Sequence, residues 1–346
     1  MEGNSGAIFA QGKQSIKIPI PVYIRASASV VGTKEGEGPL GDLFDVVGVD
    51  DKFGCDTWEE AESTLQKEAL QLAIGKAGLT NKDIRFLFAG DLLGQCIASS
   101  FGLGGFQIPL VGLYGACSTC GLSLSMATVM IAGGMAEYAA CVTSSHFASA
   151  EKEFRFPLDY GNQRPLSAHW TVTGSGAFVV SSIKSDNDRA MITGLTIGKI
   201  MDFGLKDSMN MGACMAPAAA DTILTHLHDF QKKPEDYDKI ITGDLGYVGQ
   251  KALWDMMRDQ GMDISEVHMD CGIEIFDSSQ DAHAGGSGCG CSAVTLSAYI
   301  LKQLEKGIWK RVLFVPTGAL LSKTSFNEGQ SVPGIAHAVE LVSCRG

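Results

Sequence analysis

The chain repeats one order of sequence elements, and this internal repeat restricts the fold more than any other feature. Residues 58–79 have the apolar spacing of an amphipathic helix, and a short extended apolar run follows at 84–91. The same order recurs at residues 216–230 and 238–246, and the tripeptide Gly-Asp-Leu lies at the end of both extended runs. Matches of this length arise by chance, but their common order favours a duplicated chain.

Two cysteine segments carry the same repeat. Cys117 and Cys289 are each followed by leucine and serine at the seventh and eighth positions, and both begin segments rich in Ser, Ala and Gly. Small side chains allow helices to approach closely in a protein interior. We therefore predict two buried helices after Cys117 and Cys289, packed against each other at the centre of the molecule.

Further extended runs complete the two halves. The matched runs are residues 138–145 with 311–318 and residues 176–183 with 336–343. Strands that alternate with helices and are apolar throughout are typical of α/β proteins with buried, largely parallel sheets. We predict an α/β fold of two duplicated halves, residues 1–185 and 186–346, related by a pseudo-two-fold axis.

The composition excludes some classes of partner. The formal net charge is −12 at pH 7, so nucleic acid and anionic membranes would repel the chain. The N-terminus lacks the pattern of a signal peptide, and no uninterrupted apolar stretch reaches about 18 residues, the length of a membrane-spanning helix. We expect a soluble, unsecreted protein whose ten cysteines are reduced thiols.

Cys117 lies between an apolar run and a helical segment, in the sequence YGACSTCG. At a helix N-terminus, unpaired N–H groups and the helix dipole favour a thiolate or a bound anion. The alternative is a buried structural cysteine. Cys117 and Cys120 also form a C-x-x-C pair, but a zinc or redox site is not supported, because there is no second such pair and no Cys/His pair at ligand spacing.

Polar residues at predicted strand ends are the other candidates. Asp91 and Asp244 occupy equivalent positions in the two halves, and His146 directly follows a predicted strand. Ligand contacts in α/β proteins collect at such ends. His146 could equally be a loop histidine bound to backbone. His226 and His228, on a predicted helix, are expected at the surface and without function.

These features resemble the thiolase superfamily. Residues 116–119 (ACST) are similar to its nucleophile motif, and residues 173–181 (TGSGAFVVS) to its glycine-rich strand. Residues 282–290 (AHAGGSGCG) are similar to its catalytic histidine segment, with His283 at the histidine. The resemblance implies a thiolase-like fold with five layers in the order αβαβα, and acyl-transfer chemistry with Cys117 as nucleophile.

A closer resemblance, to the stage V sporulation protein AD family, covers nearly the whole chain. Its blocks include FAGDLLGQ (88–95), VTSSHFASAEKEFRFP (142–157), AGGSGCGCSAV (284–294) and TGALLS (317–322). The resemblance implies a subunit of the spore membrane channel complex that binds dipicolinic acid, with or without calcium, in uptake during sporulation and release during germination. It also implies other channel subunits as partners and attachment to the inner membrane of the forespore and spore through protein partners. A homodimer is a separate expectation, which the resemblance does not supply.

The chain departs from the condensing enzymes of the thiolase superfamily. Asp244 stands where a ketoacyl synthase has a histidine after the second-half strand, and no GFGGTN-like motif follows. A thiol without proton-handling and oxyanion partners is a poor acyl-transfer catalyst. We therefore predict a non-catalytic binding protein with no cofactor and no metal site of its own. The alternative is a thiolase-like or ketoacyl-synthase-like acyl transferase that uses Cys117.

Dipicolinate is a dianion, so its binding to an acidic protein needs local compensation. Either the helix N-terminus at Cys117 receives the carboxylates, or the ligand arrives as its calcium chelate, which has little net charge. The sequence leaves both open. The predicted ligand-binding residues are Cys117, Asp91, His146, Asp202, Asp244 and His283.

Overall fold

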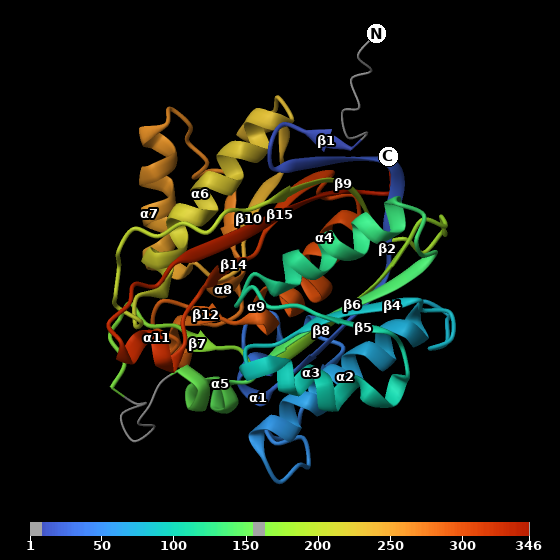
Figure 1. The fold of residues 1–346 in the computed structure, drawn as a ribbon, viewed down its shortest axis with the longest axis horizontal. Coiled ribbons are helices and arrows are strands. Elements are labelled where there is room, and N and C mark those ends of the chain that lie inside the picture. The colour runs from blue at the N-terminus through green and yellow to red at the C-terminus, as the bar shows by residue number, and fades with distance from the viewer. Residues whose placement is uncertain (1–8, 155–162, 346) are drawn as a thin grey trace.

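A long strand, β2 (Ser15–Val31), lies at the centre of a 13-stranded sheet in the computed structural model, which describes residues 9–154 and 163–345 (Figure 1). On one side of β2 the strand order is β8 (Gly174–Ser181), β6 (Tyr138–Ser145), β4 (Phe86–Gly90), β5 (Leu110–Gly112). On the other side the order is β9 (Ala190–Ile197), β15 (Gly334–Val342), β13 (Arg311–Val315), β10 (Lys239–Thr242), β11 (His268–Asp270). The two orders mirror each other, as a duplicated chain requires.

The remaining strands and the α-helices of the described chain are the following, with short 3-10 helices and one π-helix between them. Short strands are β1 (Ala10–Gln11), β3 (Val46–Val47), β7 (Trp170–Thr171), β12 (Gly286–Ser287) and β14 (Thr317–Ala319). Helices of the first half are α1 (Thr33–Gly36), α2 (Trp58–Lys76), α3 (Ile97–Leu103), α4 (Thr119–Ala132) and α5 (Phe147–Phe154). Helices of the second half are α6 (Met211–Asp229), α7 (Gly246–Asp259), α8 (Cys271–Glu274), α9 (Cys289–Thr295), α10 (Leu301–Glu305) and α11 (Lys323–Asn327).

The prediction of largely parallel sheets holds only for the outer strands. Strand β4 is parallel to β5 and β6, and β10 is parallel to β11 and β13. From β6 across β8, β2, β9 and β15 to β13, every neighbouring pair is antiparallel. Helices cover both faces of this central region, so its strands are apolar on both sides and cannot be told from parallel strands by sequence.

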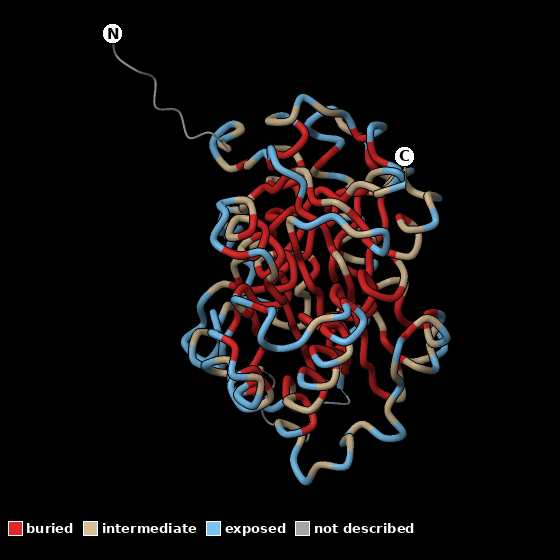
Figure 2. Tube along the Cα trace, turned by 90° about the vertical axis from the view of Figure 1, so that its right-hand side faces the viewer, coloured by how far each residue is buried: buried red, intermediate tan, exposed pale blue. Residues whose placement is uncertain are grey.

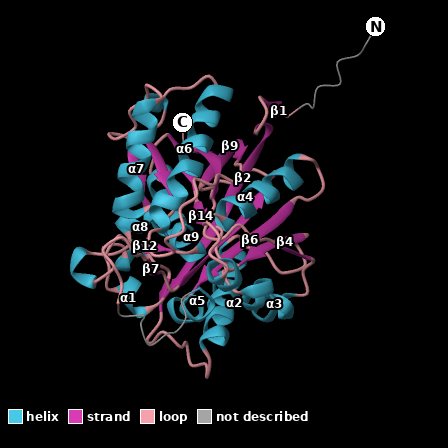
Figure 3. Cartoon of the chain, turned by 60° about the vertical axis from the view of Figure 1, so that its left-hand side comes forward, coloured by secondary structure: helices cyan, strands magenta, loops and turns pink. Residues whose placement is uncertain are grey.

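Five layers stack in the order αβαβα, and the mixed α/β architecture predicted from the sequence is confirmed (Figures 1 and 3). Helices α2 and α3 cover the outer face of the first-half strands, and α6 and α7 cover that of the second-half strands. Helices α4 and α9 lie between the two sets of strands and contact each other, as predicted. All residues of α9 are buried, and buried backbone fills the middle of the molecule in Figure 2.

Glycine allows the central helix α9 to lie directly on strand β8. A Cβ atom added to Gly290 would meet the carbonyl oxygen of Gly174 at 2.4 Å, and one added to Gly176 would meet the carbonyl carbon of Ala293 at 2.6 Å. Real Cβ atoms do not approach backbone so closely. The small residues in these segments therefore permit the close packing from which the buried helices were predicted.

Local signals set the ends of α2. The Thr57 hydroxyl accepts from the Glu60 N–H at 3.2 Å, and the Glu60 carboxylate accepts from the Thr57 N–H, which makes a capping box. Past the last helical residue, Gly78 has a φ of +69°, a conformation that ends helices. The sequence predicted this helix over 58–79, three residues longer than α2 at its C-terminal end.

The predicted boundary at residue 185 falls in the connection between β8 and β9. Since β2 and β9 are hydrogen-bonded across the two halves, the halves share one sheet, and the division into two domains stays a prediction. Residues 155–157 of the sporulation-family block, and residues 1–8 of the segment searched for a signal peptide, lie outside the described residues. Among the helices that the structure describes, none is long and apolar enough to cross a membrane.

Candidate ligand-binding site

A tight turn before helix α4 presents Cys117. Ala116 has a φ of +49°, which is rare for a residue with a side chain and is typical of strained functional turns. Two hydroxyl groups brace the turn: Ser118 Oγ donates to the Gly115 carbonyl and Thr119 Oγ1 donates to the Ala116 carbonyl, both at 2.6 Å. The Cys117 side chain is consequently fixed beside the start of α4, where it is 7% exposed.

Asp244, at the end of β10, is the polar neighbour of the Cys117 thiol. The Asp244 carboxyl accepts from Thr317 Oγ1 at 2.7 Å and from the Gly288 N–H at 3.1 Å, and the thiol lies within hydrogen-bonding reach of it. Burial raises the pKa of Asp244 from 3.8 to about 7, and its hydrogen bonds oppose that rise. The site therefore contains a carboxyl group that is largely uncharged below pH 7.

The Cys117 thiol is protonated in this environment. Burial, together with the nearby Asp244 and Cys289, raises its pKa well above the usual value of 9.0. The helix N-terminus was expected to favour a thiolate, but the desolvation of a charge at this depth outweighs the dipole. Cys117 thus differs from an activated cysteine nucleophile.

The equivalent cysteine of the second half lies beside Cys117. Cys289 Sγ donates to the Ala116 carbonyl oxygen at 3.0 Å, and Cys117, Cys289, Leu92 and Ala150 form one apolar cluster. Cys289 is fully buried and does not line the pocket. The duplication thus places its two matched cysteines together, with only Cys117 open to a ligand.

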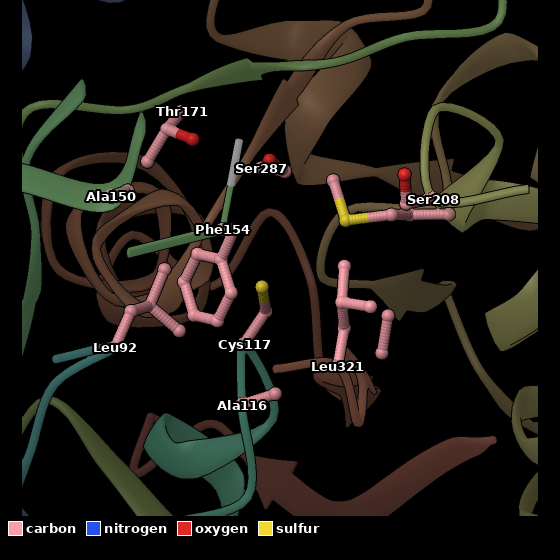
Figure 4. Close-up of a pocket in the computed structure, with 11 residues that line it drawn as sticks. Leu92, Ala116, Cys117, Ala150, Phe154, Thr171, Ser208, Ser287 and Leu321 are labelled. Carbon is pink, nitrogen blue, oxygen red and sulfur yellow. The ribbon is translucent and has the colours of Figure 1, made fainter. Parts of the chain in front are cut away.

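A narrow, mostly apolar pocket opens over the Cys117 thiol (Figure 4). It is lined by Leu92, Ala116, Cys117, Ala150, Phe154, Thr171, Ser208, Met211, Ser287, Ala319 and Leu321. The space between atoms amounts to about 440 Å³, but only about 30 Å³ is open to the centre of a water molecule. Helix α4 begins two residues after Cys117 and α6 begins at Met211, so two helix N-termini adjoin the pocket and favour a negatively charged ligand.

Asp91 and His146 are buried outside the pocket lining. The Asp91 carboxylate accepts from the Leu93 N–H at 2.9 Å and from Ser99 Oγ at 2.6 Å, so it organises the loop after β4. His146 Nε2 donates to the Asp51 carbonyl at 2.7 Å, and its ring packs against Trp58. Burial lowers the pKa of His146, which is therefore neutral at pH 7.

Asp202 and His283 also lie apart from Cys117. Asp202 is exposed, and its carboxylate accepts from the Gly204 N–H at 2.8 Å and from Ser331 Oγ at 2.6 Å. His283 is half-buried, with Nδ1 donating to the Pro165 carbonyl at 2.8 Å and Nε2 2.9 Å from Asp281. Of the six predicted residues, the structure brings together Cys117 and Asp244 alone.

Sequence reasoning missed most of the pocket wall. Thr317 positions Asp244, and Phe154, Met211 and Leu321 supply apolar surface, yet none was singled out. Thr317 and Leu321 belong to the TGALLS block, and Phe154 belongs to the block of residues 142–157. Membership of these blocks was therefore the signal that the sequence offered. The path of the backbone decides which side chains of a block face the pocket. A single sequence does not reveal that path.

Cys120, the second cysteine of the C-x-x-C pair, is fully buried on α4. Its thiol is near the hydroxyls of Thr143 and Ser292, and burial raises its pKa to about 12. Over residues 9–154 and 163–345, no group of three or more His, Cys, Asp or Glu side chains is arranged to hold a metal ion. All ten cysteines are free thiols.

Comparisons with known proteins agree with this architecture. The sequence profile of the family described as stage V sporulation protein AD (SpoVAD) matches residues 12–342. Stage V sporulation protein AD of Bacillus subtilis is 43% identical over 330 residues, covering 95% of this chain and 96% of that protein.

Solved structures similar to this chain include condensing enzymes. The 3-oxoacyl-[acyl-carrier-protein] synthase III of Aquifex aeolicus superposes with a TM-score of 0.56 at 13% identity, covering 93% of this chain and 99% of that chain. Cerulenin-bound OleA of Xanthomonas campestris superposes with a TM-score of 0.57 at 15% identity, covering 93% and 96%. These likenesses establish the thiolase-like fold and leave the chemistry to the site.

Proposed function

This chain belongs to the stage V sporulation protein AD family, and we propose that it is a non-catalytic subunit that binds dipicolinic acid in a spore membrane channel complex. In this role it takes part in dipicolinate uptake during sporulation and release during germination. The observation that carries the proposal is a pocket over the protonated Cys117 thiol, flanked by two helix N-termini, with the buried Asp244 carboxyl within hydrogen-bonding reach of that thiol.

The chemistry of the pocket supports an aromatic acid as ligand. Its walls are mainly apolar, which suits a ring, while Thr171, Ser208 and Ser287 offer hydroxyl groups. The N-termini of α4 and α6 favour the carboxylates, and below pH 7 the Asp244 carboxyl adds little negative charge. We propose Cys117, which lines the pocket, and Asp244, which lies within hydrogen-bonding reach of the Cys117 thiol, as binding residues. The other four predicted residues neither line the pocket nor reach that thiol, and we leave them out of the site: Asp91, His146, Asp202 and His283.

Acyl transfer through Cys117 is the second candidate, since the fold is that of condensing enzymes and a cysteine precedes the central helix. Against it, the pKa of the thiol is raised well above 9.0, whereas the neighbouring carboxyl has a pKa of about 7 and is a weak base for such a thiol. Mass spectrometry after incubation with acyl-CoA separates the two functions, because only an acyl transferase would carry an acyl group on Cys117.

We expect isothermal titration calorimetry to detect dipicolinate binding, and Cys117→Ala to weaken it about three- to tenfold, or about 0.7–1.4 kcal/mol. The substitution removes the sulfur atom that faces the ligand without adding volume. Cys120→Ala is the matched control, because that thiol is fully buried on α4 and away from the pocket. An affinity that is equal in all three proteins would remove Cys117 from the binding site, and absence of binding to the wild-type protein would refute the proposed ligand.

We further propose that the partners are other subunits of the channel complex and a second copy of this chain. The two edge strands of the sheet differ in burial: all three residues of β11 are buried, whereas all three residues of β5 are exposed. The exposed edge at β5 supports a homodimer. Leu110 and Val111 of β5 are apolar and lie at this open edge, and an open apolar edge is a site for pairing with another strand.

We expect a dimer in sedimentation-equilibrium experiments and a monomer after Leu110→Pro, because the Leu110 N–H points away from β4 at the open edge and proline removes it, which disfavours pairing. A circular dichroism melting curve checks that the variant is folded. Val49→Pro, at an exposed loop residue away from the edge, is the control. A wild-type protein that stays monomeric at high micromolar concentration would contradict the homodimer.

A further inference from the structure

Two hollows of different size meet beside Cys117. The inner one is the pocket over the thiol, with about 30 Å³ open to the centre of a water molecule. The outer one is a wide depression with about 530 Å³ open to the centre of a water molecule, and its lining includes Gln95, Cys96 and Tyr114 as well as Ser322 and Ser325. The inner pocket as it stands has room for about one or two water molecules and none for an aromatic dicarboxylate.

Three apolar side chains belong to the lining of both hollows: Leu92, Phe154 and Leu321. They come from three separate segments, namely the loop after β4, the last residue of α5, and the segment after β14. Figure 4 shows the three side chains placed around the Cys117 thiol, with the Phe154 ring beside it. The boundary between the outer hollow and the thiol is therefore an apolar constriction made by these side chains.

The three residues differ in how firmly they are held. Leu92 and Leu321 are buried, with 5% and 8% of their surface exposed. The loop around Leu92 is held by a hydrogen bond from the Leu93 N–H to the Asp91 carboxylate. Phe154 is only partly buried. The ties of α5 to the body lie earlier in the helix: Ser149 Oγ donates to Glu62 at 2.6 Å, and the Phe147 ring stacks on Trp170.

We propose that Leu92, Phe154 and Leu321 form a gate through which a small ligand passes from the outer hollow to Cys117, and that Phe154 is its moving part. Rotation of the Phe154 side chain widens the inner pocket without disturbing the buried core, because the ring lies at the end of a helix that is anchored at its start. The proposal concerns access to the thiol and holds whatever ligand the site binds.

Alkylation of Cys117 measures the gate directly. We expect iodoacetamide to modify Cys117 slowly in the wild-type protein and about tenfold or more faster in Phe154→Ala and in Leu321→Ala, as followed by peptide mass spectrometry. A bulkier maleimide should be excluded more strongly than iodoacetamide by the wild-type protein, and this difference should shrink in both variants. Phe154→Trp should slow the reaction, since the larger ring narrows the constriction.

Controls separate opening of the gate from unfolding. Phe101→Ala and Leu205→Ala remove side chains of the same kinds that are exposed and line neither hollow, so Cys117 should react as in the wild type. Cys141 and Cys289 are fully buried, and their modification would reveal unfolding of a variant. If Phe154→Ala unfolds, the Cys117 alkylation rates of Leu321→Ala and Phe154→Trp test the gate instead. An unchanged Cys117 rate in the folded variants would overturn the gate, even if calorimetry confirms dipicolinate binding.

Discussion

Replacing Glu340 with leucine is expected to lower the free energy of unfolding by about 3–5 kcal/mol, the usual cost of removing one member of a buried ion pair. The Glu340 side chain is 4% exposed in β15. Its carboxylate accepts from Tyr237 Oη at 2.7 Å, forms an ion pair with Lys232, and lies 3.7 Å from His226 Nε2. Leucine would leave the Lys232 charge and the buried Tyr237 hydroxyl without their acceptor.

The pH dependence of this effect has a definite sign. Burial would raise the pKa of Glu340, but hydrogen bonds from His226, Lys232 and Thr193 and the Lys232 charge hold it well below the usual 4.5. A lowered folded-state pKa gives stability that is present above pH 4.5 and lost as the pH falls through the folded-state value. The difference between wild type and Glu340→Leu should therefore be constant from pH 5 to 7 and shrink in acid.

Urea unfolding at pH 7 and pH 3 measures both quantities. Glu305→Leu is the matched control, because Glu305 also pairs with a basic residue, Arg189 at 3.4 Å, but its side chain is 38% exposed. Exposed ion pairs contribute about 0–1 kcal/mol, so this variant should stay close to the wild type. A loss below about 1 kcal/mol for Glu340→Leu would mean that the network around it relaxes to satisfy its members.

The affinity for free dipicolinate is expected to fall about tenfold between pH 6 and pH 8. The pKa of Asp244 is raised to about 7, so roughly one tenth of the carboxyl remains uncharged at pH 8, and the ionised form repels a dianion. Asp244→Asn imitates the uncharged carboxyl and should bind with an affinity that changes little with pH. Calorimetry at several pH values measures this, with Asp202→Asn as the exposed control outside the pocket.

The same titration distinguishes the free acid from its calcium chelate. An ionised Asp244 would attract calcium, so a site for the chelate would bind more tightly as the pH rises, and Asp244→Asn would weaken it.

The pH dependence of folding stability provides an independent check of the Asp244 pKa. Since the folded-state pKa of Asp244 is raised, the stability linked to its protonated form is greatest below 3.8 and is lost as the pH rises through about 7. Asp244→Asn should consequently gain stability over the wild type toward pH 8.

The duplication made most of the fold predictable, because matched runs located the strands and the two central helices. It was less informative about the site. Asp91 and Asp244 end equivalent strands, yet only Asp244 reaches the Cys117 thiol, while Asp91 is among the charges that raise the pKa of Cys289. A pseudo-two-fold axis pairs each cysteine with the aspartate of the opposite half, and one sequence does not reveal which pair faces the pocket.

Side-chain direction accounts for the other differences. His226 was expected at the surface but is fully buried, where Nδ1 is 2.8 Å from Thr196 Oγ1 and Nε2 is 2.9 Å from Tyr237 Oη. The neighbouring His228 is exposed, as expected. Two histidines two positions apart on a helix point in different directions, and apolar spacing around them was too even to show which one faces the core.

Strand β2 has a consequence for synthesis of the chain. Its pairing with β9 is made by residues 15–24 on one side and 190–196 on the other, so the two partners leave the ribosome far apart in time. Until β9 emerges, the newly made first half carries a strand edge with unpaired N–H and C=O groups, flanked by apolar side chains. Such an edge can pair with other nascent chains. We expect residues 1–185 produced alone to aggregate, whereas the complete chain covers that edge with its own second half.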